Sequence, residues 1–150
     1  MGPVRNARRA DLLRSDRRVM LVVFAVALLA RLLPAVLNGG LRTWGTYDDG
    51  VYFAGADALI HGRIPYGQFV LLHPPGVLVV LAPFAWLGSI TSDGFGFVVA
   101  RVAFMLIGAV NAVLAARIAR RWGSRAALVA GLAYALSAAC LLYTSDAADE

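Results

Sequence analysis

The sequence predicts an all-α protein with several transmembrane helices. Of its 150 residues, 60% are hydrophobic and 15% are charged, with a mean hydropathy of +0.71. Soluble domains have about 45–50% apolar and about 25% charged residues. All 14 basic residues are arginine, and most of them cluster at the ends of long apolar runs. These observations exclude a soluble domain, a disordered tail and a disulfide scaffold, and they favour membrane topology over nucleic-acid binding as the role of the arginines.

The first apolar run, residues 19–37, predicts the first membrane span. It is about 28 Å long as a helix, close to the roughly 30 Å of a bilayer's hydrocarbon core. Six arginines within residues 1–18 predict a basic cytoplasmic N-terminus. No small-x-small cleavage site follows, so we expect a permanent helix. Arg31 within the span either extends to the interface or has a functional role.

An outer loop is expected over residues 39–75. Gly39 and Gly40 end the first helix, and Asp48 and Asp49 precede an apolar run over residues 51–60. Acids before such a run are a helix-start signal, which predicts a short juxtamembrane helix with Val51, Gly55 and Leu59 on one face. The outer loop is therefore expected to lie along the membrane surface.

The remaining apolar segments determine the expected threading. Residues 76–90 are short for a span and contain Pro83, which is typical of a re-entrant or short helix. Residues 97–116 and 126–139 predict two further spans. If residues 76–90 do not cross, the four arginines within residues 117–125 are cytoplasmic, as the positive-inside rule favours. We therefore expect a multi-pass protein of the plasma or inner membrane.

The C-terminal residues 140–150 differ in composition from the rest. Three of the nine acids lie in the last five residues, and the string resembles a translated sequencing adapter. We expect the natural chain to end near Ala139, which raises the net charge from +5 to +8. The single cysteine, Cys140, lies in this tail and allows no intrachain disulfide.

Several polar residues are candidates for chemistry. Asp48 and Asp49 could act as a general base or bind a hard cation, or they could simply cap a helix. His73, held by Pro74 and Pro75, could bind a phosphate or be satisfied by water. Arg101 is either an interface anchor or a phosphate contact. Asp57 and His61 are expected to pair across one helical turn, and Asn111 to bond to another helix.

The order of these elements is more specific than any one of them. It runs from Arg31 through Tyr47-Asp48-Asp49-Gly50-Val51-Tyr52, residues 58–66, Phe69 and His73-Pro74-Pro75-Gly76 to Trp86-Leu87-Gly88, Arg101 and the arginine turn at residues 120–125. Over residues 19–139 this order resembles the first part of the GT-C superfamily of integral-membrane glycosyltransferases. Protein mannosyltransferases and aminoarabinose transferases belong to that superfamily. The resemblance implies a truncated GT-C fold that is inactive by itself.

The resemblance also implies an activity and roles for individual residues. A mannose- or arabinose-like sugar would pass from a polyprenyl phosphate to an acceptor hydroxyl at the outer membrane face, with membrane lipids as the surroundings. Asp48, or next Asp49, would be the base or a ligand of Mg²⁺ or Mn²⁺, although relatives often have Asp-Glu. His73, Arg101 and Tyr52 would bind the substrate, and His73 stands where the resemblance implies a basic residue such as lysine. The alternatives are a multi-pass transporter, in which the aspartates form a gating or cation site, and a small membrane anchor.

Overall fold

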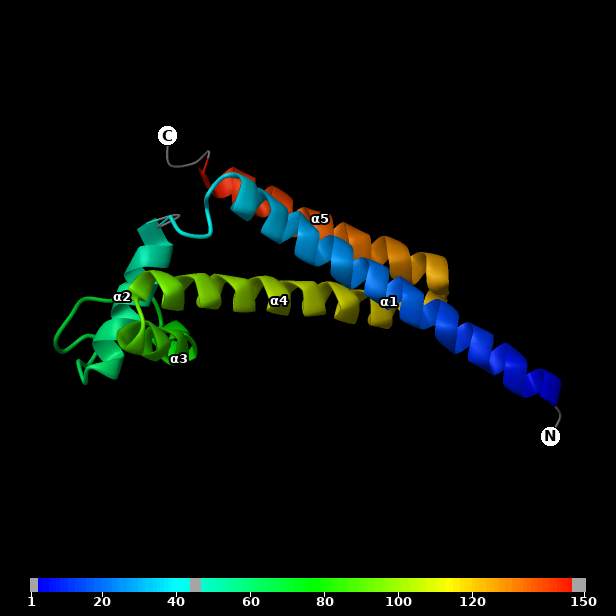
Figure 1. The fold of residues 1–150 in the computed structure, drawn as a ribbon, viewed down its shortest axis with the longest axis horizontal. Helices are drawn as coiled ribbons and strands as arrows, with labels where there is room; N and C mark the ends of the chain where they lie inside the picture. The colour runs from blue at the N-terminus through cyan, green and yellow to red at the C-terminus, as the bar shows by residue number, and fades with distance from the viewer. Residues whose placement is uncertain (1–2, 44–46, 147–150) are drawn as a thin grey trace. The chain divides into compact units, whose positions relative to one another are not determined.

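The computed structural model describes residues 3–43 and 47–146, with side chains for residues 16–43 and 48–137. The described residues form helices and turns, with one isolated β-bridge between Pro65 and Phe69. Five α-helices and one 3-10 turn follow in chain order (Figure 1): α1 Pro3–Leu37, α2 Tyr47–Ile60, α3 Gly76–Ile90, α4 Asp93–Ala119, η1 Arg120–Trp122 and α5 Ser124–Asp146. The predicted all-α class is confirmed.

Two of these helical stretches are long and apolar enough to span a membrane. They are Asp16–Leu37 and Asp93–Trp122, and they contain the predicted spans over residues 19–37 and 97–116. In the most apolar 18-residue window of each stretch, protein buries only 11% of the first and 22% of the second. Core helices of soluble proteins, by contrast, are mostly buried. Gly76–Ile90 and Ser124–Ser137 are shorter apolar helices. The structure thus supports a membrane protein with two candidate spans.

Helix boundaries differ from the predicted ones at both ends of the chain. α1 begins at Pro3 and includes most of the basic N-terminal segment. Proline is compatible with a first helical turn and arginine is a good helix former, but the prediction considered only the apolar run. The expected chain boundary near Ala139 is not marked by a helix end, because α5 continues to Asp146. The side chain of Cys140 lies outside the described side chains.

The chain forms two compact units, and the first comprises residues 1–33 and 105–150. Its core consists of small side chains from α1, α4 and α5: Val23, Ala27, Ala109, Ala112, Ala116, Ala127 and Ala135. A Cβ atom at Gly131 would lie 2.7 Å from Cγ1 of Val23, so this glycine allows close helix packing. Asp16 of α1 forms an ion pair with Arg120 of η1, which places the start of the first span beside the end of the second.

Arg31 is buried within the first unit. Its Nη1 donates a hydrogen bond to the Ala27 carbonyl over 2.7 Å. A Cβ atom at Gly108 of α4 would lie 2.8 Å from the Arg31 Nε. Arg31 therefore packs against α4 at a glycine. Extension of its side chain to the membrane interface, one of the two expected possibilities, is not what the structure shows.

The second unit, residues 34–104, contains α2, α3 and the first part of α4. Its core is formed by Phe53, Ala56, Leu81, Ala85, Phe97 and Ala100. α2 begins at Tyr47, so Asp48 and Asp49 lie in its first turn rather than before it. A Cβ atom at Gly55 would lie 3.0 Å from Cδ2 of Leu78, so part of the face expected over Val51, Gly55 and Leu59 packs against α3.

Candidate functional site

The first turn of α2 presents two exposed carboxylates, those of Asp48 and Asp49. Acidic side chains at this position complement the positive end of the helix dipole, which explains in part why the helix begins here. Asp49 has a specific partner in the structure, whereas no hydrogen bond or ion pair of the Asp48 carboxylate occurs among the described residues. The two neighbouring acids are thus chemically different.

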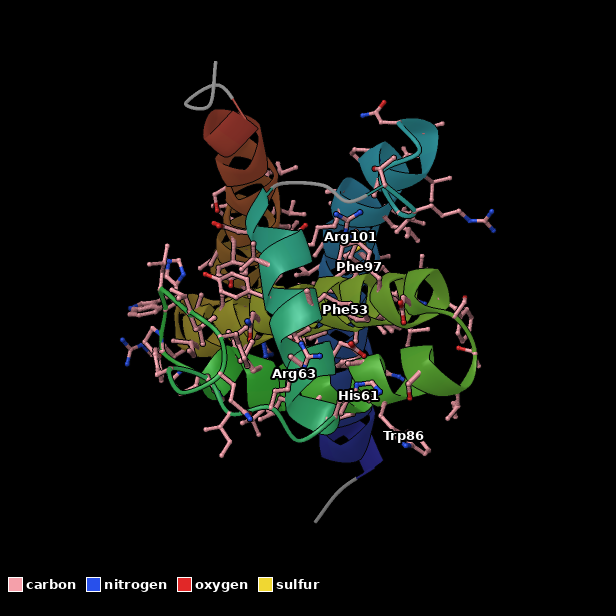
Figure 2. The ribbon with its side chains drawn as sticks, turned by 90° about the vertical axis from the view of Figure 1, so that its left-hand side faces the viewer. Phe53, His61, Arg63, Trp86, Phe97 and Arg101 are labelled. Atoms are coloured by element: carbon pink, nitrogen blue, oxygen red, sulfur yellow. The ribbon has the colours of Figure 1, made fainter. Side chains whose placement is uncertain are left out.

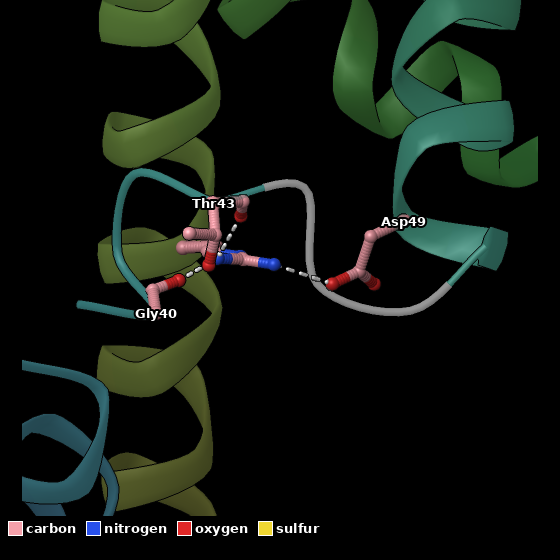
Figure 3. A network of polar contacts seen from close by, with 4 residues as sticks. Gly40, Thr43 and Asp49 are labelled. Carbon is pink, nitrogen blue, oxygen red and sulfur yellow. Dashed lines mark hydrogen bonds and ion pairs between the residues drawn. The ribbon is translucent and has the colours of Figure 1, made fainter. Parts of the chain in front are cut away.

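Arg101 of α4 is the partner of Asp49, with 2.8 Å between Nη2 and Oδ2. Its Nη1 also donates to the carbonyl oxygens of Thr43, at 2.8 Å, and of Gly40 (Figure 3). The guanidinium lies 4.4 Å from the ring centroid of Phe97, one helical turn away. Figure 2 shows these two side chains beside α2. Arg101 therefore fixes the segment before α2 onto α4.

Tyr52 and His73 form a second contact near the start of α2. Their rings meet edge to face with 5.4 Å between centroids. The Tyr66 hydroxyl donates to the His73 carbonyl over 2.7 Å, which holds this residue where the chain approaches α3. Partial burial, and then the carboxylate of Asp48, raise the pKa of the Tyr52 phenol above its ordinary value of 10.0. The phenol is therefore neutral at physiological pH and can donate a hydrogen bond.

The five predicted site residues form two separate groups of contacts at the first turns of α2. Asp49 contacts Arg101, Asp48 acts electrostatically on Tyr52 one turn later, and Tyr52 contacts His73. The sequence analysis did not identify the roles of Phe97 and Tyr66. The four-residue spacing between Phe97 and Arg101 on a predicted helix was an available signal for their contact. The Tyr66 contact depends on a loop conformation that has no sequence signature.

The expected divalent cation stays a prediction, and one of its two expected ligands already has a partner. One Asp49 oxygen is engaged by a guanidinium, and cations such as Mg²⁺ need about six oxygen donors, including waters. No group of three or more His, Cys, Asp or Glu side chains is arranged for a metal in the part of the chain that the structure describes.

The two remaining polar candidates have simpler environments. His61 Nδ1 lies 2.8 Å from the Asp57 carbonyl oxygen and 3.4 Å from the Asp57 Oδ1. The predicted pair across one helical turn is thus present, at the exposed end of α2. Asn111 is exposed on α4 and forms no hydrogen bond with its side chain within the described residues, so the interhelical bond expected for it is not seen.

The site at the start of α2 combines an open carboxylate, a neutral phenol, an imidazole and a fixed guanidinium. Together these groups can accept a proton from a hydroxyl and attract an anion. No family model, no curated protein and no solved structure matches the chain in the comparisons made.

Proposed function

We propose that the chain is part of a GT-C glycosyltransferase that transfers a sugar from a polyprenyl phosphate to an acceptor hydroxyl at the outer membrane face. One observation carries the proposal: the first turns of α2 contact two distant segments, Arg101 through Asp49 and His73 through Tyr52. Their combination of acid, phenol, imidazole and guanidinium suits this reaction. The site is also close in sequence to two helices apolar enough to span a membrane.

Asp48 is the better candidate for the general base. One oxygen of the Asp49 carboxylate is engaged by Arg101, whereas the Asp48 carboxylate has no hydrogen bond or ion pair among the described residues. In the proposed reaction the acceptor oxygen forms a bond to the anomeric carbon as the bond from that carbon to the phosphate oxygen breaks. The bonding electron pair leaves with the phosphate, and the hydroxyl proton passes to Asp48.

The leaving phosphate is already anionic, so it needs positive charge rather than a proton donor. A protonated His73 would supply this charge, and the Tyr52 phenol would donate a hydrogen bond at the same place. Arg101 acts as a positioning residue in this scheme, because Gly40, Thr43 and Asp49 already occupy its guanidinium. This assignment replaces the direct phosphate contact that the resemblance implied for Arg101.

The ion pair between Asp16 and Arg120 supports the proposed threading. It makes α1 and the end of α4 antiparallel neighbours, so the segment between the two spans begins and ends on one side of the membrane. α3 has 15 residues, about 22 Å of helix, which is short for a bilayer core of roughly 30 Å. With the arginine clusters in the cytoplasm, α2 and its acids lie outside, where a lipid-linked sugar donor is accessible.

Cysteine labelling tests this topology. In a Cys140→Ala background, Ala54→Cys on α2 should react with a membrane-impermeant maleimide in intact cells. Ser124→Cys, a nearly isosteric change at the start of α5, should react only after permeabilisation. Both residues are exposed in the structure, so accessibility depends on the side of the membrane alone. Labelling of Ser124→Cys in intact cells would contradict the threading.

Asparagine substitutions test the activity in the longer parent protein that the resemblance implies. Asp48→Asn removes the proposed base and should lower sugar transfer from a polyprenyl-phosphate donor about 10²–10⁴-fold. Asp57→Asn is the matched control, because this acid lies on the same helix and, among the residues with described side chains, pairs with His61 alone. Its transfer rate should equal that of the unmodified protein. Full transfer by the Asp48→Asn, Asp49→Asn double variant would refute the enzyme proposal.

A multi-pass transporter is the second candidate, and buried Arg31 is the observation that favours it. Ionisable residues within spans often mark a substrate or ion pathway. The Asp48→Asn variant separates the two proposals, because a transporter would lose substrate uptake while no sugar transfer would be detected in either form.

A further inference from the structure

The loop segment, residues 62–75, connects α2 to α3 and is ordered by its own hydrogen bonds. The Tyr66 amide donates to the Phe69 carbonyl over 2.9 Å, and the Gln68 amide donates to the Ile64 carbonyl over 3.0 Å. In return, the Gln68 side-chain oxygen accepts from the Ile64 amide over 2.8 Å. Tyr66 adopts a φ of +66°, which is uncommon for a residue with a side chain. The segment therefore holds a defined conformation.

Side chains alternate between two directions over residues 69–72. Leu71 is only 5% exposed, and Phe69 packs 3.7 Å from the position of a Cβ atom on Gly55. Val70 and Leu72 point away from the protein and are 84% and 86% exposed. An extended segment with one face in water normally has polar residues on that face. Here the outward face is apolar too, which indicates a second apolar environment outside the protein.

Two more apolar side chains enlarge this surface. Ile64 is 66% exposed and Tyr66 is 61% exposed, so the loop segment displays four large apolar residues. We call Ile64, Tyr66, Val70 and Leu72 the outward patch. Single exposed apolar residues are ordinary, but a group of them on one ordered loop marks an interaction surface.

The charge of this region indicates what covers the outward patch. Residues 58–92 contain no aspartate or glutamate, while His61, Arg63 and His73 lie near the two ends of the loop segment. Figure 2 shows His61 and Arg63 at the end of α2 from which the segment leaves. Apolar side chains beside basic ones are the pattern that binds a lipid surface, where acyl chains lie beneath anionic headgroups.

We propose that the loop segment inserts its outward patch into the membrane as a shallow anchor, with Arg63 at the level of the lipid phosphates. Such an anchor binds α2 to the lipid interface through the packing of Phe69 beside Gly55. It would thereby keep Asp48 at the depth at which a lipid-linked substrate presents its headgroup. The anchor itself requires only that the chain span a membrane, whereas its consequence for Asp48 rests on the proposed function.

Tryptophan fluorescence in nanodiscs tests the anchor. The full chain, with Trp44→Phe, Trp86→Phe and Trp122→Phe, carries Leu72→Trp as its only tryptophan. The discs contain phosphatidylcholine and phosphatidylglycerol, with or without brominated acyl chains. An inserted residue 72 should emit at shorter wavelength and lose roughly half of its fluorescence to the brominated lipid, because interfacial insertion reaches about 5–10 Å into the acyl boundary. The replaced side chain is apolar and exposed, so folding should not change.

Two reference variants make the result decisive. Phe104→Trp is an exposed position within the second candidate span and should be quenched strongly. Ala54→Trp is exposed on α2 and should be quenched less than Leu72→Trp. If Phe104→Trp is quenched but Leu72→Trp is quenched no more than Ala54→Trp, the anchor is refuted while the membrane spans stand. Absence of quenching at all three positions would refute the spans and the anchor together.

Discussion

Replacing Gly96 by valine is expected to separate α3 from α4 and to destabilise the second unit more than any other single change. A Cβ atom at Gly96 would lie 2.5 Å from the Phe84 carbonyl oxygen and 2.8 Å from both N and Cα of Gly88. All three are backbone atoms, so no side chain can turn aside to relieve the overlap. Overpacking costs typically about 1–3 kcal/mol, and we expect the upper part of this range or more. Unfolding in detergent by increasing SDS, followed by circular dichroism, measures the loss.

Gly94 offers a matched control on the same helix. It lies half a turn before Gly96, and a Cβ atom there would meet nothing within 4 Å. Gly94→Val therefore introduces the same side chain into open space and should change the free energy of unfolding by no more than about 0.5 kcal/mol. Equal destabilisation by the two substitutions would show that the loss does not arise from the contact between α3 and α4, and helix propensity could not explain it because valine is a better helix former than glycine.

The contact at Gly96 also illustrates which parts of the fold the sequence can predict. Apolar runs and arginine clusters predicted the first and second spans and the helix over residues 76–90, because these signals are local in the chain. Gly88 and Gly96 have no such signal. A glycine becomes essential through what lies opposite it, and that depends on how α3 turns back onto α4. The helical start of α1 was missed for a related reason, because its arginines were considered only as topological signals.

The candidate site divides in the same way. Asp48, Asp49 and His73 could be selected from residue type and order, since carboxylates and imidazoles are few in this chain. The role of Arg101 could not be predicted from residue type and order. Two of its acceptors are backbone carbonyls 58 and 61 residues away, and carbonyl oxygens are present at every position of any sequence. Only the folded loop shows that the Arg101 guanidinium is engaged by acceptors of the protein itself and thereby orders the loop.

Replacing Arg101 by leucine is the second large change that we expect. The side chain is 16% exposed, and its loss would leave the carbonyls of Gly40 and Thr43 and the Asp49 carboxylate without their donor. Hydrogen bonds to charged groups contribute about 1.5–3 kcal/mol each, but they are not additive and Asp49 is half exposed. We therefore expect a loss of about 3 kcal/mol in SDS unfolding, with faster hydrogen exchange at residues 38–43.

Two graded variants separate the parts of this network. Asp49→Asn removes only the exposed ion pair and should cost about 0.5–1 kcal/mol. Arg101→Lys keeps the positive charge but replaces the planar guanidinium by a single ammonium. Its loss of unfolding free energy should therefore lie between those of Asp49→Asn and Arg101→Leu. If Asp49→Asn is as damaging as Arg101→Leu, the carbonyl contacts contribute nothing. Arg101 would then be a mobile cation held by one acid, free to release Asp49 and bind the donor phosphate directly.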